Sequence, residues 1–305
     1  PQRFGIGDGT TVYVREVSVP APYLHDPTVK QVTLRTGQTV GVTFENHRAQ
    51  GRLEIVKQGE NNTPIQNAVF EVRNAANTLV TTLTTDAEGK AQTGLLPLGT
   101  YTLTETSVPS PYVLEPTPIT MTLTYKDMNT PVVVEARTIS NHVAEGRIKI
   151  IKKDAVNKEV LAGAVFEIRD DNNAVVDTIT TDINGVATSK NLPLGDYTVK
   201  ELTPPAGFVP NNTVYNVTLA YEDADTPVVE VELTIENEPI RGRIRVIKLA
   251  KDSATPIEGA TFELFNPDDT PAVDLYGNPV GTLTTNQDGM ALTPYLRTGT
   301  YILRE

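Results

Sequence analysis

The stretch PLGTYTLTE, residues 97–105, alternates apolar and polar side chains and then places a glutamate on the apolar side. Alternate side chains of a β-strand point to the same face, so Tyr101, Leu103 and Glu105 share one side. In one strand alone, this pattern indicates an end that runs out into solvent. The pattern recurs in three further stretches, VYVRE (12–16), YTVKE (197–201) and YILRE (301–305). A recurrent carboxylate on a buried face predicts a function for it.

The chain is a tandem repeat. Segments GRLEIVK, GRIKIIK and GRIRVIK begin at Gly51, Gly146 and Gly242, which lie 95 (146 − 51) and 96 (242 − 146) residues apart. After each opening come a segment of the NAVFEV type, a turn of the TLTTDAEGKA type and the glutamate strand, and repeats close with segments such as LTIEN. Self-similarity at a fixed period is typical of proteins built from one repeated unit.

Each repeat has the pattern of an all-β module. Short alternating segments rich in Val, Ile and Thr are separated by turn residues, and about seven strands per repeat fit a β-sandwich. The chain is predicted to hold the second half of one module (1–50), two complete modules (51–145 and 146–241) and the first half of a fourth (242–305). Both ends fall within a module, so we expect a piece of a longer protein.

Three polar residues in each complete module share the parity of the apolar side chains. Lys57 follows Leu53 and Ile55 on one strand face, and Asn141 follows Ile139 on another. Together with the glutamate, the predicted inward-facing sets are Lys57, Glu105 and Asn141, then Lys152, Glu201 and Asn237. Two sets are incomplete, namely Glu16 with Asn46, which lacks a lysine, and Lys248 with Glu305, which lacks an asparagine.

Burying a lysine beside a glutamate costs several kcal/mol per charge, so such groups tend to neutralise. An uncharged amine is a nucleophile, and a protonated glutamate can polarise the asparagine carbonyl and shuttle protons while ammonia leaves. Fixed near-attack geometry is worth about 7–11 kcal/mol. The sequence therefore predicts a Lys–Asn isopeptide bond in each complete module, with the glutamate as a single-turnover catalyst. The alternative is that the three residues only hydrogen-bond.

Family resemblance points the same way. The segments GRIKIIKKD, GAVFEI, PLGDYTVKELTPPAGF and TIEN resemble the collagen-adhesin B-type (SpaA pilin-like) modules of Gram-positive surface proteins. The resemblance implies transthyretin-like, reverse-immunoglobulin β-sandwiches arranged end to end. It also implies, as in many members, autocatalytic Lys–Asn or Lys–Asp isopeptide bonds assisted by glutamate, and a location outside the cell, at the surface or cell wall. No sorting signal or pilin-type linkage motif is visible.

Composition disfavours several other classes of protein. The formal net charge of −12 disfavours a nucleic-acid partner and favours a surface protein that its charge keeps soluble. No stretch approaches the roughly 18 apolar residues of a membrane span, so we expect no membrane insertion of this segment. The chain has no cysteine, so an exported protein of this kind would need a cross-link other than a disulfide.

No cofactor, metal site or conventional enzyme site is expected. The histidines are not accompanied by residues that would complete a metal site or a catalytic triad. There is also no nucleophile elbow or zinc-protease signature. Acidic turns such as TDAEG are interpreted as hairpin turns, because a calcium loop needs more ligands over more residues. Apart from self-cross-linking, the chain is therefore predicted not to be an enzyme. The histidines are His25, His47 and His142.

Three functions stay open at this point. The first is a structural stalk or fibre segment of a surface adhesin or pilus-like protein, whose partners would be further copies of the module and which could self-assemble into fibres. The second is a ligand-binding adhesin region for an unknown host or surface ligand, although the chain has no Trp. The third is a spacer next to a catalytic domain in a secreted enzyme.

Constant spacing favours the stalk. Each closing asparagine lies 11 residues before the next opening lysine (57 − 46, 152 − 141 and 248 − 237). With both bonds formed, only these short bridges would carry tension along the chain. We therefore expect a stiff rod that resists stretching and proteases.

Overall fold

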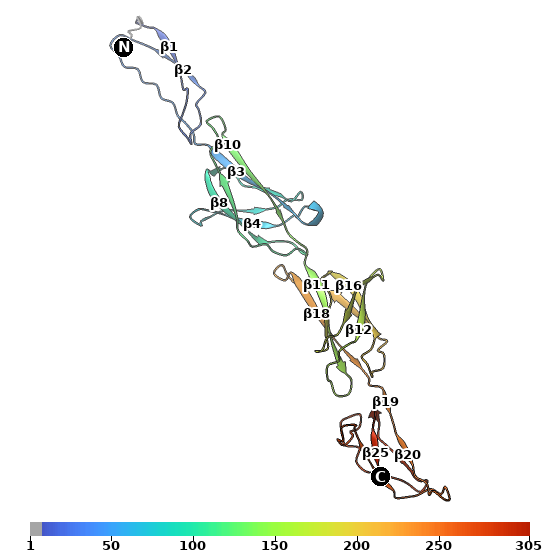
Figure 1. The fold of residues 1–305 in the computed structure, drawn as a ribbon. Helices are drawn as coiled ribbons and strands as arrows, with labels where there is room; N and C mark the ends of the chain where they lie inside the picture. The colour runs from blue at the N-terminus through green and yellow to red at the C-terminus, as the bar shows by residue number, and fades with distance from the viewer. Residues whose placement is uncertain (1–7) are drawn as a thin grey trace. The chain divides into compact units, whose positions relative to one another are not determined.

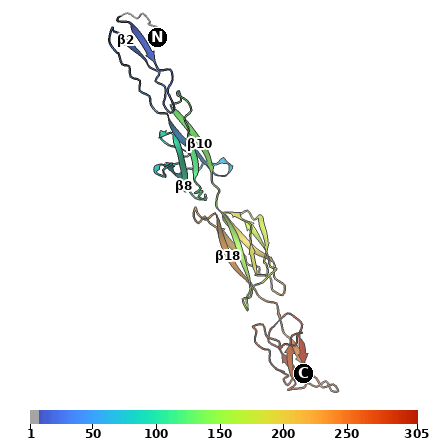
Figure 2. The ribbon, with the colours of Figure 1, turned by 60° about the vertical axis from the view of Figure 1, so that its left-hand side comes forward.

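The computed structural model describes residues 8–305, and the first half-module is therefore seen without residues 1–7. The described chain is built almost entirely from β-strands, with one short 3-10 turn, η1 (Glu60–Asn62) (Figures 1 and 2). This confirms the predicted all-β class. The chain divides into two compact units, the first comprising Pro1–Ala144 with Glu222–Pro227 and the second Glu145–Tyr221 with Val228–Glu305.

Within residues 8–144, the first unit contains ten strands. They are β1 (Thr11–Arg15), β2 (Val29–Thr33), β3 (Gln50–Gln58), β4 (Val69–Asn74), β5 (Leu79–Thr84), β6 (Lys90–Gln92), β7 (Leu96–Pro97), β8 (Gly99–Ser107), β9 (Ile119–Leu123) and β10 (Val132–Ser140). One sheet has the order β5-β4-β8-β9, and the other has β10-β3-β6 with β7 also paired to β3. Because alternate residues of both sheets point inward, Leu53, Phe70 and Leu103 meet in one fully buried core.

The second unit repeats this sandwich. Its strands are β11 (Glu145–Asp154), β12 (Val165–Asp170), β13 (Val175–Thr180), β14 (Val186–Thr188), β15 (Leu192–Pro193), β16 (Gly195–Thr203), β17 (Val214–Leu219) and β18 (Val228–Asn237). The sheets are β13-β12-β16-β17 and β14-β11-β15, with β18 also paired to β11. Ile148, Phe166 and Val199 take the core positions of Leu53, Phe70 and Leu103.

The first and last strands of each sandwich lie side by side and run parallel. Nine residue pairs join β10 to β3, with Ile139 opposite Lys57, and ten join β18 to β11, with Ile235 opposite Lys152 (Figure 1). The chain therefore opens and closes each sandwich on neighbouring strands of one sheet. The closing asparagine, Asn141 or Asn237, comes two residues after the isoleucine that pairs with the lysine.

The remainder of the second unit forms smaller sheets. Its strands are β19 (Arg241–Gly242), β20 (Arg245–Ile247), β21 (Thr261–Phe265), β22 (Leu283–Thr284), β23 (Met290–Leu292), β24 (Leu296–Arg297) and β25 (Ile302–Arg304). Within residues 241–305, β20 pairs with β23 and β25 pairs with β21. Two small clusters of buried residues replace the single large core of the complete sandwiches.

Both half-modules leave their apolar faces partly open. Residue Leu303 of YILRE is 39% exposed and Val14 of VYVRE is 36% exposed, whereas Leu103 and Val199 are fully buried. The alternation that predicts an inward face is thus right in residues 51–237 and at Val246, Phe262 and Leu264, whereas Val14 and Leu303 depart from it. Strands β1 and β2 have no facing sheet in residues 8–50, and residues 242–305 contain no counterparts of β9 and β10, so neither side chain is fully covered.

Candidate cross-link sites

The structure brings Lys57, Glu105 and Asn141 together inside the first complete sandwich. The lysine comes from β3, the glutamate from β8 and the asparagine from the residue after β10, and their exposed fractions are 0%, 3% and 1%. Lys57 Nζ contacts the carboxamide oxygen Oδ1 of Asn141 and lies 2.9 Å from Glu105 Oε1. The three groups that the strand parity placed on one inward face are therefore in direct contact.

The glutamate bridges the two other groups. Its second oxygen, Oε2, accepts hydrogen bonds from Asn141 Nδ2 at 2.7 Å and from the backbone N–H of Glu115 at 2.8 Å. Nδ2 of Asn141 also donates to the carbonyl oxygen of Val113 at 2.7 Å, and this second hydrogen bond fixes the plane of the carboxamide. Oε1 of Glu105 makes no hydrogen bond and faces the lysine amine. One carboxyl group thus contacts both the amine and the amide nitrogen.

The second complete sandwich repeats this geometry. Lys152 Nζ contacts Asn237 Oδ1, lies 3.4 Å from Glu201 Oε1 and also donates to the carbonyl oxygen of Ile235 at 3.2 Å. Asn237 Nδ2 donates to Glu201 Oε2 at 2.9 Å. The exposed fractions of lysine, glutamate and asparagine are 0%, 6% and 2%. Two independent modules therefore build one arrangement.

A glycine turn positions each lysine. The backbone N–H of Lys57 donates to the carbonyl of Gly89 at 2.7 Å, and Gly89 has a positive φ of 71°. A Cβ at this glycine would lie only 2.2 Å from the carbonyl oxygen of Lys57, so a larger residue cannot occupy the turn. Gly185 makes the equivalent contact with Lys152. The acidic segment TDAEG is thus a tight turn that joins β5 of one sheet to β6 of the other and packs against the lysine strand. The predicted hairpin is wrong, because β5 and β6 do not pair with each other.

Burial sets the protonation of both lysines. Desolvation lowers the pKa of Lys57 and of Lys152 below the ordinary lysine value, while the neighbouring Glu105 and Glu201 oppose the shift. The amine nitrogens also lie 5.5 Å and 5.8 Å from the ring centroids of Phe70 and Phe166, which form part of the apolar wall. This environment increases the fraction of uncharged, nucleophilic amine.

The contact of the glutamate differs from the one expected from the sequence, in which its carboxyl group polarises the asparagine carbonyl. The asparagine carbonyl oxygen contacts the lysine amine, and the glutamate contacts the amide nitrogen in both sandwiches. A carboxyl group in this position can carry a proton from the attacking amine to the leaving nitrogen. The geometry therefore favours proton transfer as the role of the glutamate over polarisation of the carbonyl.

The incomplete sets retain part of the arrangement. In the first half-module, Asn46 Nδ2 donates to Glu16 Oε2 at 2.7 Å and to the carbonyl of Leu24 at 2.9 Å. In the last, Lys248 Nζ donates to Glu305 Oε2 at 2.6 Å, with 31% and 54% of the two side chains exposed. The first set has the acceptor without a lysine, and the second has the amine without an asparagine.

The sequence analysis missed one buried carboxylate, Asp154. It continues the alternation of Ile150 and Lys152 on β11, and this continuation is the signal that identifies it. The residue is 2% exposed, and its Oδ2 accepts a hydrogen bond from the Arg297 guanidinium at 2.5 Å. Its Oδ1 accepts the backbone N–H of Val156 at 2.7 Å. The carboxylate is therefore fully partnered without any part in the cross-link site.

The Asp154–Arg297 pair has no counterpart in the other repeats. Strands β7 and β15 end in Pro97 and Pro193, where β24 ends in Arg297, and the first complete sandwich has Gly59 at the place of Asp154. The aspartate and the arginine come from successive repeats of the second unit. The pair thus joins one repeat to the next.

No other site competes with these in residues 8–305. In this part of the chain, no three or more His, Cys, Asp or Glu residues are grouped so that they could hold a metal ion. The described residues also include no helix that is both long and apolar enough to cross a membrane.

Fold and site define a class of protein, a tandem array of prealbumin-like β-sandwiches with a buried lysine, glutamate and asparagine in each complete sandwich. The chain belongs to the family of SpaA prealbumin-like fold domains, whose model matches residues 51–138, 146–237 and 242–305. This match confirms the resemblance stated from the sequence motifs.

Two relatives illustrate the likeness. The trypsin-resistant surface T6 protein of Streptococcus pyogenes serotype M6 is 39% identical over 72 residues, which are 24% of this chain and 13% of that protein. The solved structure of the Bacillus anthracis TIE protein superposes with a TM-score of 0.59 at 24% identity, over 92% of this chain and 49% of the other. The chain thus spans about half or less of these relatives.

Proposed function

We propose that this chain is a structural segment of a fibre or stalk on the surface of a Gram-positive bacterium. In this proposal, each complete module, 51–145 and 146–241, is locked by one Lys–Asn isopeptide bond. Membership of the SpaA family supports the structural role, and the curated relative is a surface protein that resists trypsin. The observation that carries the proposal is the contact of a fully buried lysine amine with an asparagine carboxamide, bridged by a carboxyl group, in both sandwiches.

The proposed reaction is an amide exchange. The uncharged Nζ of Lys57 attacks Cγ of Asn141, and the bond from Cγ to Nδ2 breaks. A proton leaves the attacking nitrogen for Oε1 of Glu105, and the carboxyl group returns a proton from Oε2 to the departing nitrogen. Ammonia is released, the glutamate ends as it began, and Lys152, Glu201 and Asn237 react in the same way.

Three features of the site promote this reaction. Amine and carboxamide are held in contact, which replaces an unfavourable encounter by a fixed geometry worth about 7–11 kcal/mol. The sandwich core excludes bulk water, so hydrogen bonds to the reacting groups act in a low dielectric. Burial lowers the pKa of each lysine and so supplies the nucleophilic form.

The intact mass of the purified protein tests the proposal. We expect a mass lower than that of the translated sequence by two molecules of ammonia, one for each complete module. Asn141→Ala and Asn237→Ala should each retain one of these losses, and the double variant neither. Asn46→Ala is the matched control, because its half-module has no lysine, and it should keep both losses. A parent mass equal to the sequence mass would overturn the proposal.

Stability should depend on pH once a bond is prevented. In Asn141→Ala the amine of Lys57 stays free, and its pKa is lower in the folded than in the unfolded chain. Between these two pKa values the unfolded chain binds more protons, so the free energy of unfolding should rise with pH up to the ordinary lysine value of 10.5. In the parent the same nitrogen is an amide and does not titrate. Urea unfolding of both proteins across this range measures the difference, and equal slopes would contradict it.

A further inference from the structure

One short segment orients two of the three groups in the first complete site. Residues 113–115 lie in the connection between β8 and β9. The carbonyl oxygen of Val113 accepts a hydrogen bond from Asn141 Nδ2 at 2.7 Å, and the backbone N–H of Glu115 donates to Glu105 Oε2 at 2.8 Å. Whatever holds this segment therefore also positions the glutamate against the asparagine.

The middle residue of this segment, Leu114, is held by a loop from a later part of the chain. Residues 222–227 lie between β17 and β18 in the chain and belong to the first compact unit. The backbone N–H of Leu114 donates to the carbonyl oxygen of Ala224 at 2.8 Å, and both residues pack against the core of the first sandwich. A loop 110 residues later in the chain (224 − 114) thus supports the cross-link site.

The second complete site makes the same two contacts around a different middle residue. The carbonyl oxygen of Val209 accepts from Asn237 Nδ2 at 3.0 Å, and the backbone N–H of Asn211 donates to Glu201 Oε2 at 2.7 Å. Between them stands Pro210, which has no N–H to donate and whose ring fixes its φ. This segment therefore cannot be held through its middle N–H.

A side chain holds the segment of the second site instead. Nδ2 of Asn211 donates to the hydroxyl of Tyr215 at 2.9 Å and to the carbonyl oxygen of Glu236 at 3.1 Å. In the first site, Glu115 takes the place of the asparagine and Ile119, which has no hydroxyl, takes the place of the tyrosine. The second segment is thus anchored within its own sandwich, and the first is anchored by the loop.

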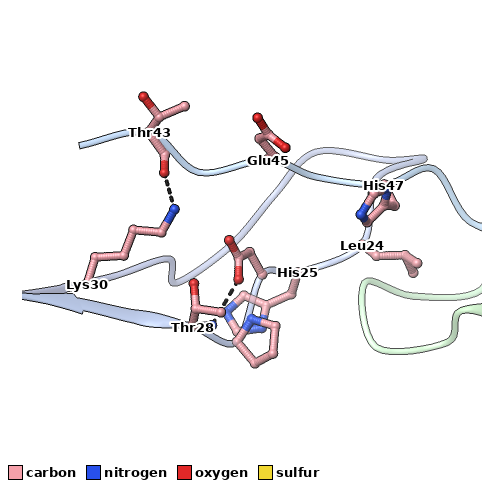
Figure 3. A pocket seen from close by; sticks show the side chains of 9 residues that line it. Leu24, His25, Thr28, Lys30, Thr43, Glu45 and His47 are labelled. Atoms are coloured by element: carbon pink, nitrogen blue, oxygen red, sulfur yellow. Dashed lines mark hydrogen bonds between the residues drawn. The ribbon is translucent and has the colours of Figure 1, made fainter. Parts of the chain in front are cut away.

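A second loop of this kind supports the first half-module. Residues 124–131, between β9 and β10, correspond in sequence to the end of the connection between β17 and β18. The backbone N–H of His25, the counterpart of Leu114, donates to the carbonyl oxygen of Met128 at 2.9 Å. Figure 3 shows His25 and its neighbour Leu24 in the segment that receives this loop. The contact is therefore a repeated feature of the array.

We propose that the loop of residues 222–227 positions the first site, so that the bond between Lys57 and Asn141 forms at its full rate only after this loop has docked. The inference rests on the proposed function, because it concerns the rate of the same amide exchange, in which Nζ replaces Nδ2 on Cγ and ammonia leaves. Without the hydrogen bond to Leu114, segment 113–115 loses a fixed point between the two groups that it orients. The loop residues are positioning residues, because they act through Leu114.

One module would then depend on the next. Residues 222–227 reach their place only when the strands that flank them, β17 and β18, have folded. The bond between Lys152 and Asn237 needs no such loop, since Pro210 and Asn211 hold its segment. We therefore expect the second complete module to cross-link independently and the first to follow it.

The rate at which each bond forms tests the inference. The whole 305-residue protein is made by cell-free synthesis, synthesis is stopped, and samples are denatured and digested at intervals. Mass spectrometry of the cross-linked peptides then reports each bond separately. Ala224→Asp puts a carboxylate where the alanine packs against the first core, which displaces the loop. We expect the bond between Lys57 and Asn141 to form about 10- to 100-fold more slowly, and the bond between Lys152 and Asn237 to form at the parent rate.

Matched variants separate positioning from a general loss of structure. Leu114→Pro removes the donating N–H and should slow the same bond, whereas Leu114→Ile keeps the N–H and should react like the parent. Asp225→Ala changes an exposed side chain of the same loop and should have no effect. Leu114→Pro combined with Glu115→Asn and Ile119→Tyr copies the anchor of the second module, so it should restore the parent rate even in the presence of Ala224→Asp.

The same time courses distinguish this inference from the proposed function. A parent protein that forms neither bond would overturn the proposed function. A parent that forms both bonds, with Ala224→Asp slowing neither of them or both equally, would overturn the further inference alone. Equal rates for Leu114→Pro and the parent would also overturn it.

Discussion

Pulled from its two ends, a complete module is expected to lengthen by almost nothing. Lys57 and Asn141 lie 84 positions apart in the chain, and Lys152 and Asn237 lie 85 apart. Once the proposed bonds form, the residues between each pair carry no tension. Force would enter the first sandwich along β3, cross at the lysine and leave after β10. Without the bond, 84 extended residues would add roughly 280–300 Å. Force spectroscopy of the chain between fixed handles measures this length.

Asn141→Ala is the variant that tests whether the proposed bond prevents this lengthening. It removes the bond and keeps the core, so it should release that length in one step while the second module stays closed. Asn46→Ala should behave like the parent, since its half-module contains no lysine. Unfolding steps of about 280 Å in the parent would show that the modules are not locked.

Loss of the carboxyl group proposed to catalyse the bond should lower stability by a large amount. Glu105→Ala is expected to fold without forming its bond, because no group remains to move the proton. By the chain-entropy treatment of cross-links, closing a loop of about 85 residues stabilises by roughly 4–5 kcal/mol. In a domain of this size, that change corresponds to a fall of roughly 16–40 °C in the thermal midpoint. Differential scanning calorimetry with parallel mass measurement tests both parts.

Two controls separate the bond from the buried charge. Glu105→Ala also leaves Lys57 without its carboxyl partner, which destabilises the core by itself. Asn141→Ala prevents the bond but keeps that pair, so its loss of stability reports the cross-link together with the carboxamide hydrogen bonds to Glu105 and Val113. Glu16→Ala removes the equivalent carboxyl from a half-module and should retain both ammonia losses. A Glu105→Ala protein that still loses two ammonia molecules would exclude the proposed role of the glutamate.

Much of the fold and most of the site could be predicted from the sequence. Strand parity identified Lys57, Glu105 and Asn141 because an alternation of two residues assigns every side chain of a strand to one face. It could not show that the carboxyl group contacts the amide nitrogen, since that contact depends on how β8 faces β10 across the core.

The same reasoning was wrong at the ends for a physical reason. Parity states which residues share a face, but only a second sheet makes that face an interior. Val14 keeps the pattern and stays exposed because β1 and β2 have no facing sheet in residues 8–50, and Leu303 stays exposed because residues 242–305 contain no counterparts of β9 and β10. Asp154 could not be predicted from the repeat pattern, because that pattern identifies only residues that recur in every repeat and this aspartate occurs in one.

The single pair of Asp154 with Arg297 restricts how the gene for this array can evolve. Duplication of residues 146–241 would place the buried aspartate opposite a proline such as Pro193, without a cation. A carboxylate at the position of Gly59 would require the ring of Tyr112 to shift, because a Cβ there would lie 2.6 Å from it. The repeats are therefore not interchangeable in spite of their similar sequences, and their order along the chain matters.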